Sequence, residues 1–421
     1  MKKAALILLA LALCLNMGGC LGAVQADDYI YVVGIGVDKG SQYRFNITLL
    51  VQKEVSGTEQ ASTGGAEIIS AEGDTVFDAI TVLSVGVPFR INFSRMNTFF
   101  FGEEVARGGS IKELAGVTFN ALNIRQSVKL MVCLGTAQRL MQGLCMKDVP
   151  NITKLQFRIF EDCAADGSTV ITNYARILES IRGRRSDPVM MLGGVDVSAV
   201  KGQESMAEEM TGAGEKGKKG EKGEKGEENG EGQEEWEKYT TGGVRRLGGM
   251  SAYVAGTALF DGWYMKGALS GYDTMFLLLG RGELKKGSVK VTYNEDWVVI
   301  YIKDEKPPKV KLTLSGAPRA SMELELACSI VKYKGDAGLD EWGSGLQQTA
   351  EKLIENEMDR VFKICRGLNS DAFGFGEYAS TQFCDVVSWE EYDWKSRYPL
   401  METEFSVKLE LADENVTTRL E

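Results

Sequence analysis

The stretch "VKVTYNEDWVVIYIKDEKPPKVKLTLSGAPRASMELEL", Val289–Leu326, decides the fold of the C-terminal half of the chain. Apolar and polar side chains alternate in four successive runs, which is the pattern of β-strands with one buried face. The apolar positions are Val289, Val291, Tyr293, Val298, Ile300, Ile302, Val310, Leu312, Leu314, Met322, Leu324 and Leu326. We therefore predict four strands of a β-meander.

A long helix and a final strand follow this meander. Apolar residues recur at helical spacing on one stripe, formed by Ala350, Ile354, Met358, Val361, Cys365 and Leu368. The alternating run "FSVKLEL" at Phe405–Leu411 predicts a closing strand. Before the meander, Asp261-Gly262 lies between apolar flanks and predicts a β-hairpin turn, and "SGYDTMFLLLG" suits a helix. The long helix is expected to cover the sheet, which makes this half α+β.

The N-terminal half alternates strands with helices. "YIYVVGIGVD" (Tyr29–Asp38) and "YRFNITLLVQ" (Tyr43–Gln52) predict an opening hairpin, and a helix is expected after a cap at Asp74 or Thr75. Further strands at "MNTFFFG" and "SVKLMVCLG" are each followed by helical patterns. The predicted fold class is α+β, with a mixed α/β N-terminal region and a β-meander-plus-long-helix C-terminal domain. A division into three small α/β domains stays open.

The composition of the chain limits its chemistry. The 421 residues carry a formal net charge of −11 and no basic stripe, which argues against nucleic acid as a partner. There is no histidine, so Ser-His and Cys-His nucleophiles, histidine bases and the usual mixed zinc sites are excluded. We expect no cofactor, no metal and no catalytic residue, although a pair of carboxylates needs no histidine.

The cysteines show no metal or redox spacing. Beyond Cys14 and Cys20, six remain, and none forms a CxxC pair: Cys133, Cys145, Cys163, Cys328, Cys365 and Cys384. An even number in an exported protein permits disulfides. Apolar surroundings favour mostly free thiols that pack as small hydrophobic side chains.

The first twenty residues have the order of a bacterial lipoprotein signal. Lys2 and Lys3 precede the apolar run Ala4–Leu15, and Gly18 and Gly19 stand directly before Cys20. Small residues before a cysteine predict cleavage after residue 19 and lipidation of Cys20. The chain would then divide into a signal peptide at 1–19 and a lipidated tether at 20–27, anchored by its acyl chains. An uncleaved anchor helix is the alternative, but the apolar run is shorter than a membrane span.

A charged segment separates the two halves. Residues 201–249 contain few apolar side chains, and 12 Glu and 6 Lys lie from Glu204 to Lys238. Such a segment cannot bury enough surface to offset its ordering entropy, so we predict a disordered insertion. Its glycines keep a short G-x-y register, but a collagen helix needs many more repeats and abundant proline. The predicted domains are therefore 28–200 and 250–421.

Seven stretches of the chain form a set that occurs in one known family: "VVGIGVD", "EGDTVFDAI", "FFFGEEVARGG", "VCLGTAQRLM", "VAGTALFDGWYMKGALS", "DAFGFGEYA" and "SWEEYDW". In these stretches the chain resembles the GerC lipoproteins, the C subunits of spore germinant receptors. Family landmarks fall at Gly36, Asp38, Gly73, Ala79, Gly102, Glu103, Ala106, Gly109 and Gly135. The chain departs from the family pattern around Arg95, where members often carry a histidine, and in its charged insertion. That insertion resembles an elaborated loop between neighbouring strands.

The resemblance implies a function without chemistry on this chain. It implies a lipid-anchored, non-enzymatic subunit on the outer face of the spore inner membrane, assembled with the A and B membrane subunits of the receptor. Its role would be receptor assembly or signalling in nutrient-triggered germination. The A and B subunits would supply nutrient recognition and any ion path.

The C-terminal stretch "SWEEYDWKSRY" is the candidate interface. Trp389, Tyr392, Trp394 and Arg397 lie among charged residues, and aromatic and arginine side chains dominate binding energy at interfaces. The alternative is that both tryptophans pack in the core. Gly374 and Gly376 suit a turn with positive φ, and Glu103 and Glu104 suit the start of a helix.

Two other function classes stay open. A solute-binding lipoprotein of an uptake transporter would share the export signal, the anchor and the size, but it needs two α/β lobes around a cleft. A carboxylate-dependent glycosidase needs two inward carboxylates in a cleft. The fold and the carboxylate positions separate these classes from a receptor subunit.

Overall fold

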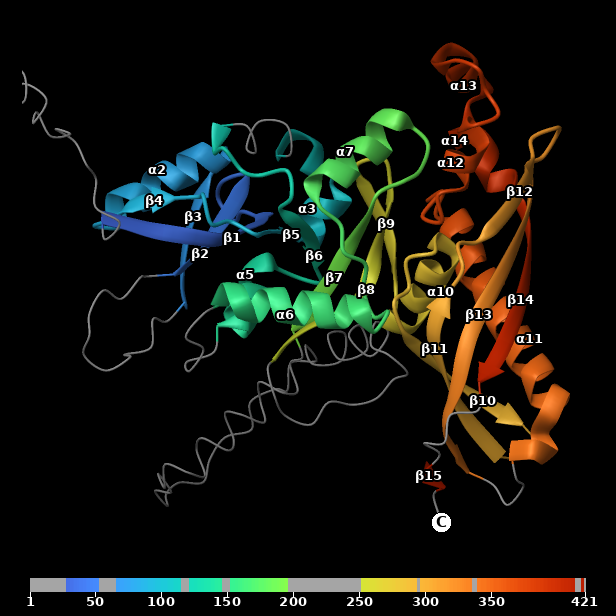
Figure 1. The fold of residues 1–421 in the computed structure, drawn as a ribbon. Coiled ribbons are helices and arrows are strands. Elements are labelled where there is room, and N and C mark those ends of the chain that lie inside the picture. The colour runs from blue at the N-terminus through green and yellow to red at the C-terminus, as the bar shows by residue number, and fades with distance from the viewer. Residues whose placement is uncertain are drawn as a thin grey trace, which may run out of the picture.

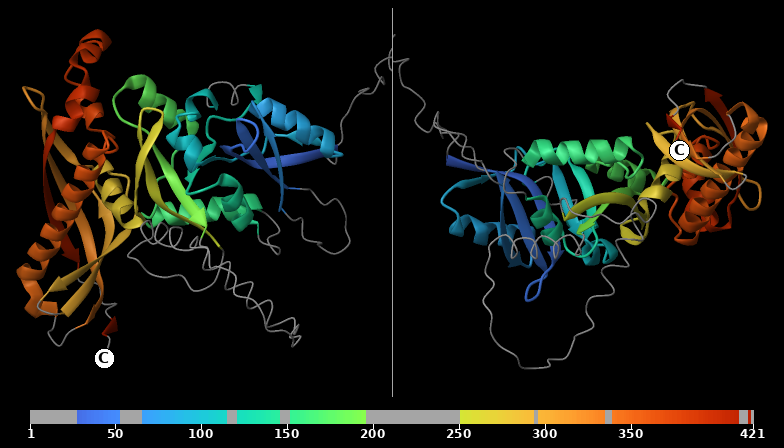
Figure 2. Two further views of the ribbon diagram at one scale, coloured as in Figure 1. Left: turned by 180° about the vertical axis from the view of Figure 1, so that it is seen from behind. Right: turned by 90° about the horizontal axis from the view of Figure 1, so that it is seen from below.

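The computed structural model describes residues 28–52, 66–114, 121–145, 152–195, 251–293, 296–334, 339–412 and 418–419. These residues form two β-sheets with helices packed against them, which confirms the α+β fold class (Figure 1). The second sheet lies beside one end of the first, and the N-terminal strands lie at the opposite end (Figures 1 and 2). The predicted signal peptide, the tether at 20–27 and the insertion at 201–249 lie outside the described residues.

The first sheet has nine described strands in the order β3-β2-β1-β5-β6-β7-β8-β9, with β4 also paired to β1. Their bounds are β1 (Tyr29–Lys39), β2 (Phe45–Gln52), β3 (Ala66–Gly73), β4 (Arg90–Asn92), β5 (Thr98–Gly102), β6 (Lys129–Cys133), β7 (Val189–Val195), β8 (Ala252–Asp261) and β9 (Tyr264–Leu269). Strands β1, β5, β6 and β7 run parallel, and antiparallel pairs extend the sheet on both sides.

Helices cover both faces of this sheet. They are α2 (Val76–Gly86), α3 (Glu103–Arg107), α5 (Ala137–Leu144), α6 (Ile152–Ala165) and α7 (Tyr174–Gly183). Buried side chains of α2, α3 and α7 join one core cluster, and those of α5 and α6 join another on the opposite face (Figure 1). Both the predicted hairpin and the predicted cap at Thr75 are confirmed, and Thr75 forms a capping box with Asp78.

The second sheet is built around one long strand. Its strands are β10 (Gly287–Tyr293), β11 (Asp296–Glu305), β12 (Lys309–Thr313), β13 (Arg319–Lys334), β14 (Glu402–Ala412) and β15 (Thr418–Arg419). The meander is confirmed, with one difference: β11 and β12 follow one another along the same edge of β13. Pro307 and Pro308 separate them, because proline has no N–H to donate to a ladder. On the other edge β14 pairs with β13 in parallel.

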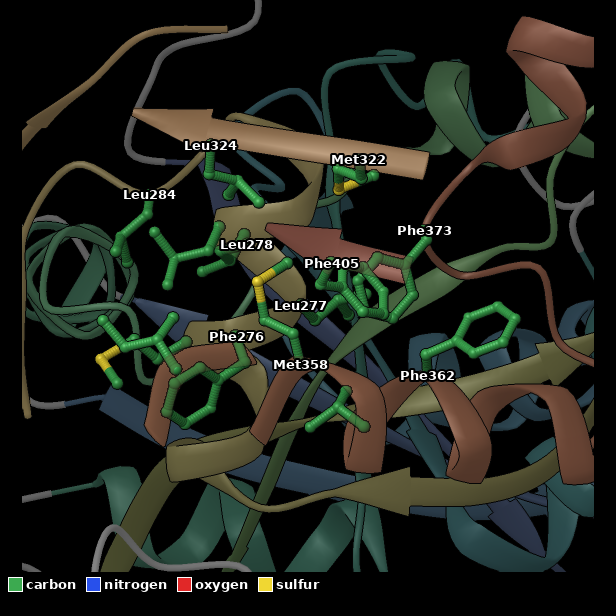
Figure 3. Close-up of a cluster of buried hydrophobic side chains, with 14 of the residues drawn as sticks. Phe276, Leu277, Leu278, Leu284, Met322, Leu324, Met358, Phe362, Phe373 and Phe405 are labelled. Carbon is green, nitrogen blue, oxygen red and sulfur yellow. The ribbon is translucent and has the colours of Figure 1, made fainter. Parts of the chain in front are cut away.

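The long helix covers this sheet as predicted. Helix α11 (Leu339–Gly367) buries Ala350, Ile354, Met358, Val361 and Cys365 in a core shared with α10 (Gly271–Arg281) and the strands. Figure 3 shows Met358 and Phe362 facing Phe373, Phe405 and the α10 leucines in this core. After α11 the chain forms the short helices α12 (Phe375–Ser380), α13 (Val386–Tyr392) and α14 (Trp394–Arg397), then the 3-10 turn η3 (Tyr398–Leu400).

The charged segment connects two neighbouring strands. Val195 at the end of β7 is the register partner of Ala252 at the start of β8, so the two strands form a hairpin around residues 196–251. Strands β8 and β9 therefore belong to the first sheet, although the predicted domain boundary at 249/250 assigns them to the C-terminal half. Strand pairing, rather than the change in composition, sets where this sheet ends.

The thiols follow the sequence-based expectation. Cys133, Cys145, Cys328, Cys365 and Cys384 are free cysteines. Burial raises the pKa of the Cys145 thiol to about 11 and that of Cys328 to about 12. The buried Cys133, Cys328 and Cys365 are inert packing residues, whereas Cys384 is exposed.

Candidate functional site

A cavity of about 350 Å³ lies where the first sheet meets the C-terminal helices. Four segments that are distant in the sequence form it: the end of α7 with the residues that follow it, the turn between β8 and β9, the loop after α11, and helices α13 and α14. Its walls are Ser180, Ile181, Arg184, Ser186, Asp187, Pro188, Asp261, Gly262, Asp371, Trp389, Glu390, Asp393, Trp394 and Lys395.

Asp371 is the most deeply buried charged group of this cavity, at 1% exposure. Its Oδ1 accepts hydrogen bonds from the N–H groups of Gly374 (3.1 Å) and Phe375 (3.0 Å). Its Oδ2 accepts from the N–H of Gly376 (2.7 Å) and from the indole Nε1 of Trp394 (2.9 Å). Four donors therefore fix this carboxylate at the start of α12, where backbone N–H groups lack helical partners.

Asp187 links the loop after α11 to the first sheet. Its Oδ2 accepts from the N–H of Asp371 at 2.8 Å, and its Oδ1 accepts from the N–H of Gly262 at 3.1 Å. Lys395 forms ion pairs with Asp187 and, at 3.0 Å, with Asp261, and its Nζ donates to the carbonyl of Asn369 at 2.6 Å. We call Asp187, Asp261, Asp371 and Lys395 the polar clasp. It joins the β8–β9 turn and the entry to β7 to the C-terminal helices.

Two glycines make this geometry possible, for different reasons. Gly374 has φ of 79°, a conformation that favours glycine, as the sequence predicted. Gly376 does not have a positive φ. Any Cβ at Gly376 would collide with the carbonyl oxygen of Arg185 and with Nε1 of Trp394. The glycine therefore permits close approach of three segments.

Burial determines the titration of this region. Burial raises the pKa of Asp371 to about 6, against the opposing effect of the N–H donors of Gly376 and Trp394. Burial also raises the pKa of the Tyr398 hydroxyl, which donates to the carbonyl of Ser370 at 3.0 Å. Both groups hold the backbone that leads into α12.

The clasp brings three carboxylates to one cavity, which is the arrangement that the glycosidase alternative requires. Each carboxylate, however, already has protein partners: Asp371 accepts four hydrogen bonds, Asp187 binds two N–H groups and Lys395, and Asp261 binds Lys395. A general acid or base must exchange its proton with substrate. The geometry of these contacts serves to hold the chain together. Within the described residues, no three Asp, Glu or Cys side chains come together as metal ligands.

Two of the four predicted interface residues, Trp389 and Trp394, line this cavity, whereas Tyr392 and Arg397 do not. Trp389 and Trp394 are 5% and 4% exposed, so they pack in the core, the alternative that the sequence left open. Tyr392 is half-buried and donates to the carbonyl of Leu314 at 3.2 Å. The guanidinium carbon of Arg397 lies 4.5 Å from the centroid of the Tyr392 ring. An interface at this segment stays a prediction. Directly before the segment, Val386 and Val387 are exposed apolar residues.

Four of the family landmarks of the N-terminal half, Asp38, Gly102, Glu103 and Gly135, line a second depression, of about 330 Å³. It lies at the carboxyl ends of β1, β5 and β6, where α/β sheets commonly bind ligands. Asp38 lines this depression, and its carboxylate accepts hydrogen bonds from the N–H groups of Ala137 (2.7 Å) and Gln138 (3.0 Å) at the start of α5. Any Cβ at Gly102 would collide with Oδ1 of Asp38. These landmarks therefore position the sheet and its helices.

Glu103 and Glu104 begin α3, as predicted. Glu103 binds Arg107 one turn later, and Glu104 pairs with Lys39 at 2.9 Å. Sequence reasoning missed Asp187, Asp261 and Lys395, because residues that meet across 134 to 208 positions leave no local pattern. Asp371 is the first residue of the landmark "DAFGFGEYA", which is a usable signal.

Two family models match the chain, one in each half. "Spore germination protein N-terminal domain" matches residues 22–193, and "Spore germination B3/ GerAC like, C-terminal" matches residues 255–414. The charged segment falls between the two matches. None of the helices in the described ranges is long and apolar enough to cross a bilayer.

Two individual proteins are also similar to this chain. YfkR of Bacillus subtilis (strain 168), whose name assigns it provisionally to spore germination, is 28% identical over 136 residues. That match covers 31% of this chain and 35% of YfkR, so it spans about a third of that relative's length. The crystal structure of the GerBC protein matches with a TM-score of 0.51 at 13% identity, over 90% of this chain and 96% of that one, which shows the shared fold. The chain belongs to the GerAC/GerBC family of spore germination proteins, the family of germinant receptor C subunits.

Proposed function

We propose that this chain is a lipid-anchored, non-catalytic C subunit that acts in receptor assembly or signalling during nutrient-triggered germination. The observation that carries the proposal is the order of three features: a lipoprotein-type signal ending at Cys20, then the N-terminal family match, then the C-terminal one. The subunit would sit on the outer face of the spore inner membrane. Its partners would be the A and B membrane subunits of the receptor.

The contacts of the polar groups support a role without chemistry. The carboxylates of the cavity hold the backbone and Lys395, and Asp38 in the depression at β1, β5 and β6 binds the N–H groups that begin α5. The solute-binding alternative needs two α/β lobes, whereas the second sheet is mainly antiparallel with one long helix. A protein of this design acts through its surfaces.

Substitution of Cys20 tests the anchor. Cys20→Ala should give a folded precursor that leaves the membrane fraction, because anchoring depends on the thioether and the sheets carry their own cores. The measurements are detergent-phase partitioning, membrane fractionation and circular-dichroism melting. Retention of this variant in the membrane would indicate an uncleaved helix.

Co-purification tests the assembly. The tagged wild-type chain, extracted from spore membranes, should bring down the A and B subunits of the receptor. A Cys20→Ala chain serves as the matched control for the contribution of the anchor. Recovery of a soluble nutrient with the isolated chain, without either subunit, would favour the solute-binding alternative.

A further inference from the structure

The outer face of α2 is apolar and open. Val82 and Val85 are 59% and 86% exposed, and Val85 is the most exposed large apolar residue in the part of the chain that the structure describes. Helix α2 carries one charged residue, Asp78, in its first turn, and no charge in its last two turns. Water-facing helices usually carry charged residues on this face. The face is therefore suited to a partner that accepts apolar side chains.

The hydroxyls of α2 do not make this face more polar. Thr81 Oγ1 donates to the carbonyl of Phe77 at 2.8 Å, and Ser84 Oγ donates to the carbonyl of Ile80 at 2.7 Å. Hydroxyls bonded four residues back satisfy their donors within the helix. The end of α2 can thus enter an apolar layer without leaving a hydroxyl donor unsatisfied.

The sheet topology brings this end of α2 to the entry of the chain into the fold. Strand β3 runs parallel to β1, so α2 returns along the sheet and β4 follows beside the first residues of β1, with Tyr29 paired to Arg90. Figures 1 and 2 show α2, β4 and the start of β1 together at the end of the molecule far from the second sheet. The last turns of α2 therefore lie next to the point where the chain leaves β1 toward Cys20.

Tyrosine and arginine side chains lie at this end of the sheet, on the face opposite α2. The rings of Tyr29 and Tyr31 lie 6.3 Å apart, and the guanidinium carbon of Arg95 lies 3.9 Å from the centroid of Tyr31. Arg90 is exposed on β4. Tyrosine and arginine are suited to the boundary between lipid and water. Asp28 and Glu67 lie at the same end, so the apolar face rather than net charge would supply most of the attraction.

We infer that Val82 and Val85 form a surface that rests on a lipid bilayer. This α2 docking face rests on the proposed function, because the lipidated Cys20 would lie nine residues before Tyr29, within about 30 Å of extended chain. A short tether keeps the face close to the membrane and raises its effective concentration there. The docking fixes which end of the subunit faces the bilayer.

Lipid-borne quenching measures this docking. The probe is a fluorophore on Gly86→Cys, a position with open space around it, in a Cys384→Ser background of the full lipidated chain. The matched control is the same label on Val387→Cys, an equally exposed site on α13 at the far end of the molecule (Figure 1). On phosphatidylcholine and phosphatidylglycerol vesicles with brominated acyl chains, the label at 86 should be quenched several-fold more than the label at 387.

Substitution of the face gives the second arm. Val82→Ser with Val85→Ser should reduce quenching at 86 several-fold, to the level at 387, while melting stays unchanged, because both side chains are exposed. Equal quenching at 86 and 387, or no effect of the serines, would overturn the proposal. If the label at 86 is shielded only when the A and B subunits are present, the face binds a protein partner. That result also overturns the proposal.

The anchor is tested separately. A chain with a polyhistidine tag in place of the lipid at residue 20 binds nickel-chelating lipid, and the chain has no histidine of its own to compete. If the natural chain is not lipidated but the tagged chain on nickel-chelating lipid is still quenched at 86, the proposed anchor is contradicted and the docking face is supported. Loss of quenching on both tethers would overturn the docking face alone.

Discussion

The carboxylate of Asp187 accepts a hydrogen bond from the backbone N–H of Asp371, which lies 184 residues further along the chain. The backbone N–H of Asp187 in turn donates to the carbonyl of Asp371 at 3.2 Å. One residue precedes β7 of the first sheet, and the other follows the long helix of the second. This pair therefore sets how the C-terminal helices sit against the first sheet.

Removal of the Asp187 carboxylate should destabilise the fold. Asp187→Ala leaves the N–H groups of Gly262 and Asp371 without their acceptor and leaves Lys395 with one carboxylate fewer. Unsatisfied buried donors cost about 1–3 kcal/mol each, so a loss of roughly 3 kcal/mol in the free energy of unfolding is expected. Urea denaturation followed by circular dichroism measures it.

Glu390→Gln is the matched control for Asp187→Ala. Glu390 also lines the cavity, but its side chain is exposed at the rim. Its substitution should change the free energy of unfolding by less than about 0.5 kcal/mol. Similar losses for both variants would mean that the cavity tolerates no change, and that the clasp has no special part in stability.

The titration of Asp371 predicts an unusual pH dependence. Its pKa is about 6 in the folded chain against an ordinary value of 3.8, because the carboxyl is buried. Between about pH 4 and pH 6 the folded state holds a proton that the unfolded state has released, so stability falls as the pH rises through this window. A shift of about two units corresponds to roughly 3 kcal/mol.

Asp371→Asn isolates this contribution. The variant does not titrate, so the stability difference between wild type and variant should be largest near pH 4 and should shrink by up to roughly 3 kcal/mol by pH 7. Urea unfolding of both proteins across this range gives the difference at each pH. A difference that stays constant from pH 4 to pH 7 would show that the four N–H donors keep the carboxyl ionised throughout.

The two tryptophans should respond differently to loss of the indole N–H. Trp394 Nε1 donates to the buried Asp371 at 2.9 Å, whereas Trp389 Nε1 lies 3.4 Å from the carbonyl of Gly183. Trp394→Phe should therefore cost more than Trp389→Phe, by about 1–2 kcal/mol, since bonds to charged groups are the stronger ones. Thermal melts of both variants check this difference. Trp→Ala at either site is expected to cost about 3–5 kcal/mol of stability.

Receptor binding measured beside these melts tests the predicted interface. Both Trp→Ala variants should lose melting temperature together with partner binding, as expected for core residues. Tyr392→Ala and Arg397→Ala, which alter less buried side chains, are the informative changes. Normal melting with lost co-purification would support an interface at this segment, and normal behaviour in both assays would remove it.

Local patterns predicted most of the secondary structure because they depend on neighbouring residues. Alternation found the strands of the second sheet, the Asp261-Gly262 pair found the β8–β9 turn, and the helical stripe found α11. Strand β3 was missed, since its side chains are mostly half-exposed and Ile68 and Ile69 stand next to one another without alternating. Pairing at a sheet edge, and not periodicity, makes this segment a strand.

Partners distant in sequence could not be predicted in this way. Charged residues around Trp389 and Trp394 suggested a surface, yet both rings point inward. Asp393 between them adopts φ of 51° and separates α13 from α14, which turns both indoles to the same side while Glu390 and Glu391 stay exposed. The placement of β11 and β12 one after the other on the same edge of β13 likewise depends on pairing between distant residues.

Shortening of the charged segment should have little effect on stability. Removal of Glu204–Lys238 with a short glycine-serine bridge leaves the ends of β7 and β8 as register partners, at Val195 and Ala252. Loop length has a weak effect on closure entropy, so the melting temperature should change by a few degrees at most. A large loss of stability would mean that this segment packs on the described fold. Differential scanning calorimetry of the shortened and full chains makes the comparison.

Close approach at Gly376 predicts a large effect from one methyl group. A Cβ there would collide with the carbonyl oxygen of Arg185 and with Nε1 of Trp394, both part of the surroundings of Asp371. Gly376→Ala should therefore lower the free energy of unfolding by more than about 2 kcal/mol, since the backbone must shift to admit the methyl. Gly367→Ala is the matched control, because Gly367 ends α11 with no atom within 4 Å of the added Cβ. That change should stabilise by about 0.5–1 kcal/mol through helix propensity. Changes of opposite sign in the free energy of unfolding, measured with urea, would place the constraint at the clasp. Equal small changes would show that α12 moves freely enough to accept a side chain.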